Sequence, residues 1–181
     1  MTALPAEAKP LIGHFELHPS QTDPYKIYTN KRSIRLIVSG VGKKSVAAAV
    51  THLAELCDSN GSDAWLNVGV AGHRSFPLGK LVAAHKISDK ETCRSWYPPP
   101  LIEFPCETST IFTVGKETRN YPDEALVEME AAGFYDATSR LCSHELIHCL
   151  KVVSDNIDEK RLDGRSVTKM VSAQLDAVES V

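Results

Sequence analysis

Short runs of aliphatic and β-branched residues alternate along this chain with segments in which apolar residues recur at helical spacing. Strands are predicted at Ile34–Val38, Ala64–Val68, Lys80–Ile87, Thr110–Val114 and Cys149–Val153. Helices are predicted at residues 44–57, 128–142 and 167–178, where apolar side chains line one face. This alternation indicates an α/β sandwich with a largely parallel sheet, and 181 residues suit a single domain spanning 1–181.

Three polar or glycine-rich turns follow predicted strands directly. They are Ser39–Gly42, Gly69–Gly72 and the pair Ser154 and Asp155. In open α/β sheets, ligands bind beyond the carboxyl ends of the strands. We therefore expect one site to gather all three turns.

Composition and charge mainly exclude classes of binding partner and cellular location. Apolar residues make up 43% of the chain and the net charge is −3, which gives no electrostatic reason to expect nucleic acid or an anionic membrane surface. The five cysteines are scattered without a CxxC pair, no apolar run approaches the ~20 residues that span a bilayer, and the first residues lack the pattern of a secretory signal. We expect a cytoplasmic protein that binds neither nucleic acid nor membrane.

The segment 144–148, His-Glu-Leu-Ile-His, matches the HExxH motif of zinc proteases. That chemistry needs both histidines one turn apart on a helix, with a third ligand downstream. Here the pentad lies where a helix should end and a strand begin, and downstream positions hold Lys151 and Ser154. We interpret it as a connector with two exposed or half-buried histidines and expect no metal site.

The turn Gly40-Val41-Gly42-Lys43-Lys44-Ser45 resembles a nucleotide-triphosphate loop, but Ile37 stands at the position of the first glycine, and Lys43 is followed by Lys44 instead of Ser or Thr. As a glycine turn that leads into a helix, it can still hold an anion, a water or a ribose hydroxyl. Gly40 and Gly42 are therefore candidate site residues, and no cofactor is expected.

Residues 89–109 interrupt the alternation. Pro98-Pro99-Pro100 fits neither a helix interior nor a central strand. The segment is predicted to be a surface excursion, either an inert loop or an interface arm that uses Trp96 and Tyr97.

Four segments, in this order, resemble the purine nucleosidase and nucleoside phosphorylase superfamily in its methylthioadenosine/S-adenosylhomocysteine nucleosidase branch. They are Leu36–Ala49 with its S-G-V-G-K turn, Asp63–Asp89 with Asn67, Gly69, Ala71 and Gly72, Val127–Ala132 with V-E-M-E-A, and Val152–Asp158 with S-D-N-I-D. The resemblance implies a three-layer αβα sandwich with a mixed, largely parallel central sheet. It also implies cleavage of the N-glycosidic bond of a purine nucleoside, and a homodimer or higher homo-oligomer.

The resemblance further implies a role for each matching residue. Asp155 would protonate the leaving base, Glu130 would accept the ribose hydroxyls with Met129 packed on the sugar, and Glu7 would activate the attacking water. Weaker candidates for contact with the base are Thr113, Val114 and Ser154. Val70 belongs to the turn that would face the nucleophile.

The nucleophile is either water or phosphate. Phosphorylases of this superfamily hold phosphate with an arginine and a hydroxyl residue at positions that here carry Asn67 and Val70. A dianion without such partners binds poorly, which favours water. Lys9 and Lys43 are cations that keep the phosphorylase alternative open.

Three departures from the family pattern bear on activity, and one of them is that Val70 replaces a hydroxyl residue. Only Met1 and Thr2 precede Ala3, where the family has a β-strand, so either that strand is lost or the start lies upstream; Glu7 would then belong to a poorly anchored terminus. Lys151 stands where the nucleosidases carry an arginine. A degenerate member that binds a nucleoside without catalysis is therefore a second hypothesis.

Overall fold

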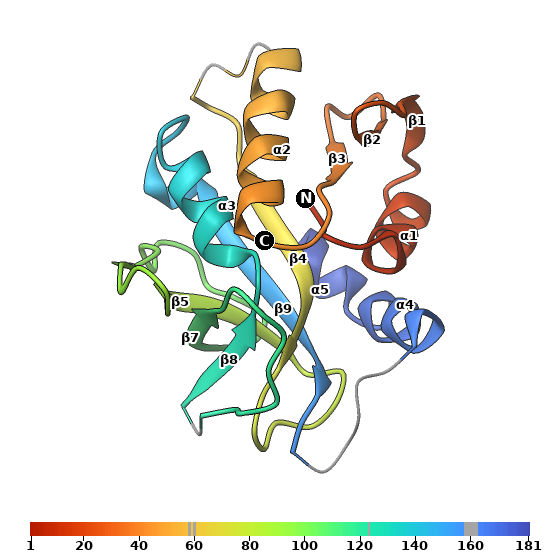
Figure 1. The fold of residues 1–181 in the computed structure, drawn as a ribbon. Coiled ribbons are helices and arrows are strands. Elements are labelled where there is room, and N and C mark those ends of the chain that lie inside the picture. Colours follow the sequence, from red (N-terminus) through yellow and green to blue (C-terminus); the bar gives the residue numbers. More distant parts are fainter. Residues whose placement is uncertain (58, 60, 123, 158–162) are drawn as a thin grey trace.

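The computed structural model describes residues 1–57, 59, 61–122, 124–157 and 163–181 (Figure 1). The helices are α1 (Pro5–His14), α2 (Lys43–Leu56), α3 (Ala131–Thr138), α4 (Gly164–Ser172) and α5 (Leu175–Glu179). The strands are β1 (His18–Gln21), β2 (Lys26–Thr29), β3 (Arg35–Val38), β4 (Trp65–Gly72), β5 (Leu81–Asp89), β6 (Ser95–Trp96), β7 (Glu107–Thr113), β8 (Ala125–Glu128) and β9 (Ile147–Asp155). In these described residues, no helix is both long and apolar enough to cross a membrane.

The larger sheet closes on itself. Its strand order is β6-β5-β7-β8-β4-β9, and β5 also pairs with β9, so strands β5, β7, β8, β4 and β9 form a partly closed ring. Neighbours pair in parallel at β5–β7, β7–β8 and β4–β9, and antiparallel at β4–β8 and β5–β9. The fold is mixed α/β as expected, but it is not the plain three-layer sandwich that we predicted.

Strand β5 is the reason that the sheet curls. Residues 81–83 pair with β9, whereas residues 82–89 run along β7, with a register shift between Ala84 and Lys86. A bulge of this kind bends a strand and increases its twist. The bend lets one long strand pair with partners on both sides and close the ring.

Helices cover the ring on two sides. Figure 1 shows α2 and α3 on one side and α1 and α4 on the other. Between them, residues 147–154 of β9 are all buried, as expected for a parallel strand packed on both faces. Around this part of the ring, one apolar cluster lies under α2 and α3 and another lies under α1 and α4.

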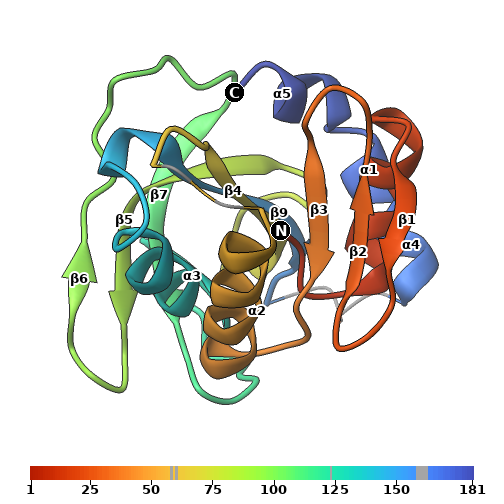
Figure 2. The same ribbon diagram turned by 90° about the horizontal axis from the view of Figure 1, so that it is seen from above.

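The N-terminal region forms a second sheet that sequence patterns did not predict. Strands β1, β2 and β3 pair antiparallel, on the side of the ring where α1 and α4 lie (Figure 2). The hairpin β1–β2 and helix α1 carry no clear periodic pattern, and α1 contains Pro10 within its length.

The chain terminus before α1 is firmly held, and the expectation of a poorly anchored Glu7 was wrong. The Thr2 N–H donates to the Ile37 carbonyl (3.1 Å), and the Met1 carbonyl accepts from the Val68 N–H (3.0 Å). These first residues therefore connect β3 on one side with β4 on the other. Such pairing fixes the start of α1, from which Glu7 projects.

Most predicted elements are present with shifted ends, and two helices differ. The predicted helix 128–142 is present only as the shorter α3, with its first residue, Glu128, at the end of strand β8, and the predicted helix 167–178 is divided into α4 and α5. The segment 125–128 is buried at every position, so its apolar residues belong to a sheet neighbour of β7 and not to a helix face.

Gly133 permits a close approach between α3 and α2. A Cβ at this position would lie 2.7 Å from the Lys43 Cα and 2.9 Å from its carbonyl carbon, both of them backbone atoms. We expect Gly133→Ala to lower the free energy of unfolding by about 1–3 kcal/mol, measured by urea denaturation, because overpacking forces the helices apart. The matched control is Gly13→Ala in α1, where a Cβ meets no described atom within 4 Å, and it should stabilise by about 0.4–1 kcal/mol. Equal effects at both positions would contradict this account.

Candidate active site

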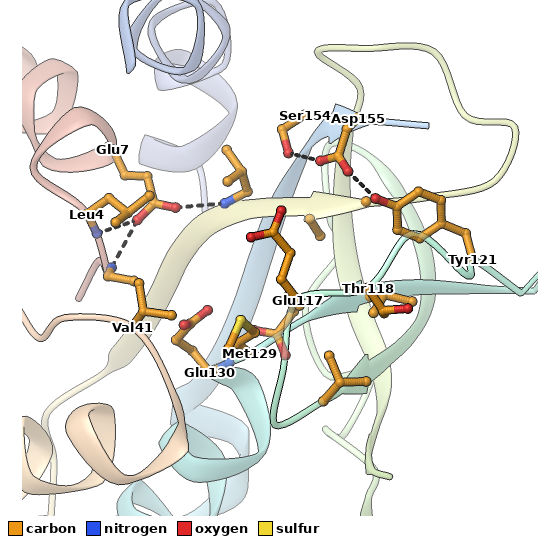
Figure 3. A pocket seen from close by; sticks show the side chains of 17 residues that line it. Leu4, Glu7, Val41, Glu117, Thr118, Tyr121, Met129, Glu130, Ser154 and Asp155 are labelled. Carbon is orange, nitrogen blue, oxygen red and sulfur yellow. Dashed lines mark hydrogen bonds between the residues drawn. The ribbon is translucent and has the colours of Figure 1, made fainter. Parts of the chain in front are cut away.

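One cavity opens where α1, β4, β8 and β9 end or begin close together (Figure 3). It is lined by Ala3, Leu4, Glu7, Val41, Val70, Ala71, Gly72, Val114, Glu117, Thr118, Tyr121, Val127, Glu128, Met129, Glu130, Ser154 and Asp155. Among the residues singled out from the sequence, the lining includes Glu7, Val70, Val114, Met129, Glu130, Ser154 and Asp155. Gly40, Gly42 and Thr113 lie outside it.

Glu7 is fixed by backbone donors from two segments. One carboxylate oxygen, Oε2, accepts from the N–H groups of Ala3 (2.9 Å) and Leu4 (2.8 Å), and the other, Oε1, accepts from the Val70 N–H (3.0 Å). The side chain is buried, and burial raises the pKa of its carboxyl although Lys151 and the three N–H groups oppose the rise. The carboxylate is therefore held in one orientation at the cavity wall.

Glu130 is the residue that precedes α3, and its carboxylate reaches across to the glycine turn. Its Oε1 accepts from the Gly42 N–H at 2.8 Å, and the side chain lines the cavity. Gly42 adopts φ +100°, a conformation that favours glycine, and is the N-cap residue directly before α2. Gly42 thus acts through Glu130, while Gly40 donates its N–H to the Ala3 carbonyl (3.1 Å). Burial raises the pKa of Glu130, and the nearby charge of Glu128 adds to the rise.

A buried ion pair that the sequence analysis did not predict lies behind this wall. Lys151 Nζ is 3.0 Å from Glu128 Oε2, and both side chains are 1% exposed. The same Glu128 carboxylate accepts from the N–H groups of Glu130 (2.9 Å) and Ala131 (2.8 Å) and from the Thr113 hydroxyl (2.6 Å). Although burial opposes its charge, the carboxylates of Glu128 and Glu130 raise the pKa of Lys151. Thr113, predicted to contact the base, instead holds Glu128.

Asp155 ends β9 and receives two hydroxyl donors. The Ser154 hydroxyl donates to Oδ1 at 2.6 Å, and the Tyr121 hydroxyl donates to Oδ2 (Figure 3). Burial and the hydrogen bond to Asp155 raise the pKa of Tyr121. Tyr121 belongs to the irregular segment between β7 and β8, which carries no motif that could have identified it from the sequence.

The cavity is lined by acidic side chains. Five carboxylates face it, from Glu7, Glu117, Glu128, Glu130 and Asp155, and no lysine or arginine is among the described lining residues. Lys151 lies behind Glu128 and compensates only part of this charge. Such a field favours positive charge that develops inside the cavity.

The two lysines considered as phosphate partners lie elsewhere. Lys43 Nζ pairs with Asp89 Oδ1 (2.7 Å) and Glu91 Oε2 (2.6 Å), and Lys9 is exposed on α1. Neither lines the cavity.

The HExxH pentad does not form a helical metal site. His144 lies in a 3₁₀ turn over His144–Leu146, and His148 lies in β9. His144 is exposed as expected, whereas His148 is buried, which the sequence analysis did not predict. Within the described part of the chain, no group of three or more His, Cys, Asp or Glu side chains is placed to hold a metal ion.

Comparison with known proteins found similarity in structure alone, because no family model and no curated protein sequence matches this chain. A 5′-methylthioadenosine/S-adenosylhomocysteine nucleosidase from Helicobacter pylori, solved with butyl-thio-DADMe-Immucillin-A, superimposes with a TM-score of 0.79 at 15% identity, covering 99% of this chain and 94% of that one. The corresponding nucleosidase from S. pneumoniae, solved with a transition-state inhibitor, gives 0.72 at 20% identity, covering 98% and 97%. A futalosine hydrolase mutant from Helicobacter pylori gives 0.75 at 12% identity, covering 99% and 94%. This chain therefore has the fold of the methylthioadenosine/S-adenosylhomocysteine nucleosidases and of futalosine hydrolase, over nearly its whole length.

Proposed function

We propose that this protein hydrolyses the N-glycosidic bond of a purine nucleoside. The observation that carries the proposal is the convergence of Glu7, Glu130 and Asp155 on one acidic cavity, each from a different element. The reaction has three requirements, namely a proton for the leaving base, stabilisation of a cationic sugar, and a positioned nucleophile. The three carboxyl groups are suited to meet them separately.

Asp155 would supply the proton to the base. Protonation at N7 lets the purine leave as a neutral molecule when the bond between C1′ and N9 breaks. Asp155 lies at the end of β9, where Ser154 fixes one of its oxygens at 2.6 Å and so orients the carboxyl group. Orientation of this kind is what a proton donor needs in order to act on a bound ring.

Glu130 and Met129 would bind the sugar. Gly42 holds one oxygen of Glu130, so the second is available to accept hydrogen bonds from ribose hydroxyls, while the apolar Met129 lines the cavity beside it. As the glycosidic bond breaks, positive charge develops on the ribose ring. The surrounding carboxylates stabilise that charge because they are already fixed in place.

Glu7 would take the proton of the attacking water. Its carboxylate is held by three backbone N–H groups, and burial raises its pKa from the ordinary value toward the range in which a carboxylate is an effective base. The water oxygen forms the new bond to C1′, and its proton passes to Glu7. Val70 contributes through its backbone, since its N–H positions Glu7 Oε1.

Water is favoured over phosphate by charge. A phosphate dianion would enter a cavity lined by carboxylates, without a lysine or arginine among the described lining residues. Repulsion between like charges in a partly buried site would make its binding unfavourable.

The test is to incubate the purified protein with methylthioadenosine, S-adenosylhomocysteine, adenosine and inosine, with and without phosphate, and to follow the free base by chromatography. We expect base release from at least one nucleoside at the same rate with and without phosphate. Release that requires phosphate would replace hydrolysis with phosphorolysis. A folded protein that releases no base from any of them would support the non-catalytic alternative.

A further inference from the structure

The Tyr121 side chain lies against Asp155, the proposed proton donor. Its side chain is only 6% exposed, and its ring lies directly on the backbone of Gly72, the last residue of β4. A Cβ at residue 72 would be 2.6 Å from the Tyr121 Cζ and 2.8 Å from its hydroxyl oxygen, so the ring fits there only because residue 72 is glycine. The arrangement is therefore a fitted contact between two segments distant in the sequence.

The Tyr121 hydroxyl also uses the part of Asp155 that a base would need. Oδ1 of Asp155 already accepts from Ser154, and Oδ2 accepts from Tyr121 (Figure 3). Each carboxylate oxygen has two acceptor positions and the phenol fills one of those on Oδ2, so a ring nitrogen that approaches Asp155 from this side competes with the phenol. Because the pKa of Tyr121 is raised, the phenol keeps its proton at neutral pH and remains a hydrogen-bond donor to Asp155.

We propose that Tyr121 competes with the leaving base for Asp155 and thereby determines which ligands the site accepts. This inference rests on the proposed function, in which Asp155 faces the base. While Asp155 is ionised, a nucleoside offers it only an N7 lone pair, which cannot replace the O–H that Tyr121 donates, and cleavage requires that Asp155 first take up from solvent the proton that it passes to N7. A base that carries hydrogen on N7 can replace the phenol O–H, so the competition disfavours the substrate more than the protonated base. Competition that disfavours the bound nucleoside more than the protonated base lowers the barrier to bond cleavage, because the site then binds the product-like state better than the ground state.

Two analogues of adenine separate this competition from simple filling of space. 9-Deazaadenine carries an N–H at position 7, whereas 7-deazaadenine has the same shape and carries a C–H there. The experiment measures the dissociation constant of each by calorimetry for the wild type, Tyr121→Phe, Tyr121→Ala and Tyr97→Phe. Tyr97 is 64% exposed and serves as the matched control for loss of a tyrosine hydroxyl.

In Tyr121→Phe the ring remains and the hydroxyl is lost, so Oδ2 of Asp155 is free for the ligand. We expect this variant to bind 9-deazaadenine roughly ten- to a hundredfold more tightly than the wild type, the range expected for a hydrogen bond to a charged group. Binding of 7-deazaadenine should change by less than about twofold, well below the tenfold that such a bond confers. Tyr97→Phe should match the wild type with both analogues.

Three results would overturn the inference. The first is an affinity of Tyr121→Phe for 9-deazaadenine that is unchanged or weaker. The second is a gain in affinity that appears only in Tyr121→Ala and is equal for both analogues. The third is that no variant binds either analogue. The proposed function is tested separately, by measuring nucleoside turnover. If the wild type turns over a nucleoside but Tyr121→Phe does not bind 9-deazaadenine more tightly, the role of Tyr121 is excluded and hydrolysis is supported. If Tyr121→Phe binds 9-deazaadenine more tightly but no nucleoside is turned over, the role of Tyr121 is supported and hydrolysis is excluded.

Discussion

Replacement of Asp155 with asparagine should lower the rate of base release by about 10²–10⁴-fold, the usual contribution of a positioned general acid. The amide has nearly the shape of the carboxyl group but cannot transfer a proton to N7. The side chain accepts hydrogen bonds from Ser154 and Tyr121, and both hydroxyls can reorient toward an amide, so the fold should be retained. The measurement is the initial rate of base release from the best nucleoside substrate, together with the circular dichroism spectrum of the variant.

The control is Asp176→Asn, since Asp176 lies exposed on α5, away from the cavity. It removes one carboxylate of the same kind and should leave the rate unchanged. A folded Asp155→Asn variant that releases base at the wild-type rate would exclude Asp155 as the proton donor. Tyr121 or solvent would then have to provide the proton.

The strands could be predicted because burial on both faces makes their sequences almost uniformly apolar. In β9, the run Cys149–Val153 was predicted as a strand without any knowledge of its neighbours, and it lies within the buried stretch 147–154. The short strand at 125–128 was not predicted, and its last residue, Glu128, was assigned to the start of the helix 128–142. Local spacing alone does not distinguish a short buried strand from the first turn of a helix.

Closure of the ring could not be predicted from the pattern. It depends on the pairing of Leu81 with Val152, which brings together residues far apart in the sequence, and on the register shift after Ala84. Both are properties of the assembled sheet, and an alternation of apolar and polar residues along one strand carries no information about its second neighbour. An α/β pattern is therefore compatible with an open sheet and with a curled one.

In the candidate site, too, residues in local motifs could be predicted, whereas contacts between distant segments could not. Glu130 and Asp155 could be proposed from the sequence because each belongs to a segment with a recognisable motif, and Glu7 because it falls where the resembling family has its N-terminal glutamate. Tyr121 belongs to no motif, and its position depends on Gly72, which lies in another strand. The resemblance drew attention to Lys151 as a substitution, but sequence alone did not reveal which carboxylates surround it.

Lys151 is a buried cation in contact with this group of carboxylates. Its Nζ is 3.0 Å from Glu128, and a Cβ at Gly69 would contact both Lys151 Nζ (3.3 Å) and Glu7 Oε1 (3.1 Å), which places the ammonium close to Glu7 as well. Burial of several carboxylates is costly unless a compensating charge accompanies them. Lys151 therefore has a structural role that is separable from proton transfer.

We expect Lys151→Met to lower the free energy of unfolding by about 3–5 kcal/mol in urea denaturation at pH 7, because loss of one partner leaves a buried charge without compensation. Lys80→Met is the matched control. Lys80 pairs with Glu107 at 2.8 Å on the surface and lies over the ring of Phe76, so its loss should cost only about 1 kcal/mol. Addition of Glu128→Gln to Lys151→Met should restore part of the lost stability, since it removes the carboxylate left unpaired. Two results would contradict this prediction: an equal loss of unfolding free energy in Lys151→Met and Lys80→Met, or a double variant that is less stable than Lys151→Met alone. Either result would show that the Lys151 ammonium does not compensate the buried carboxylates.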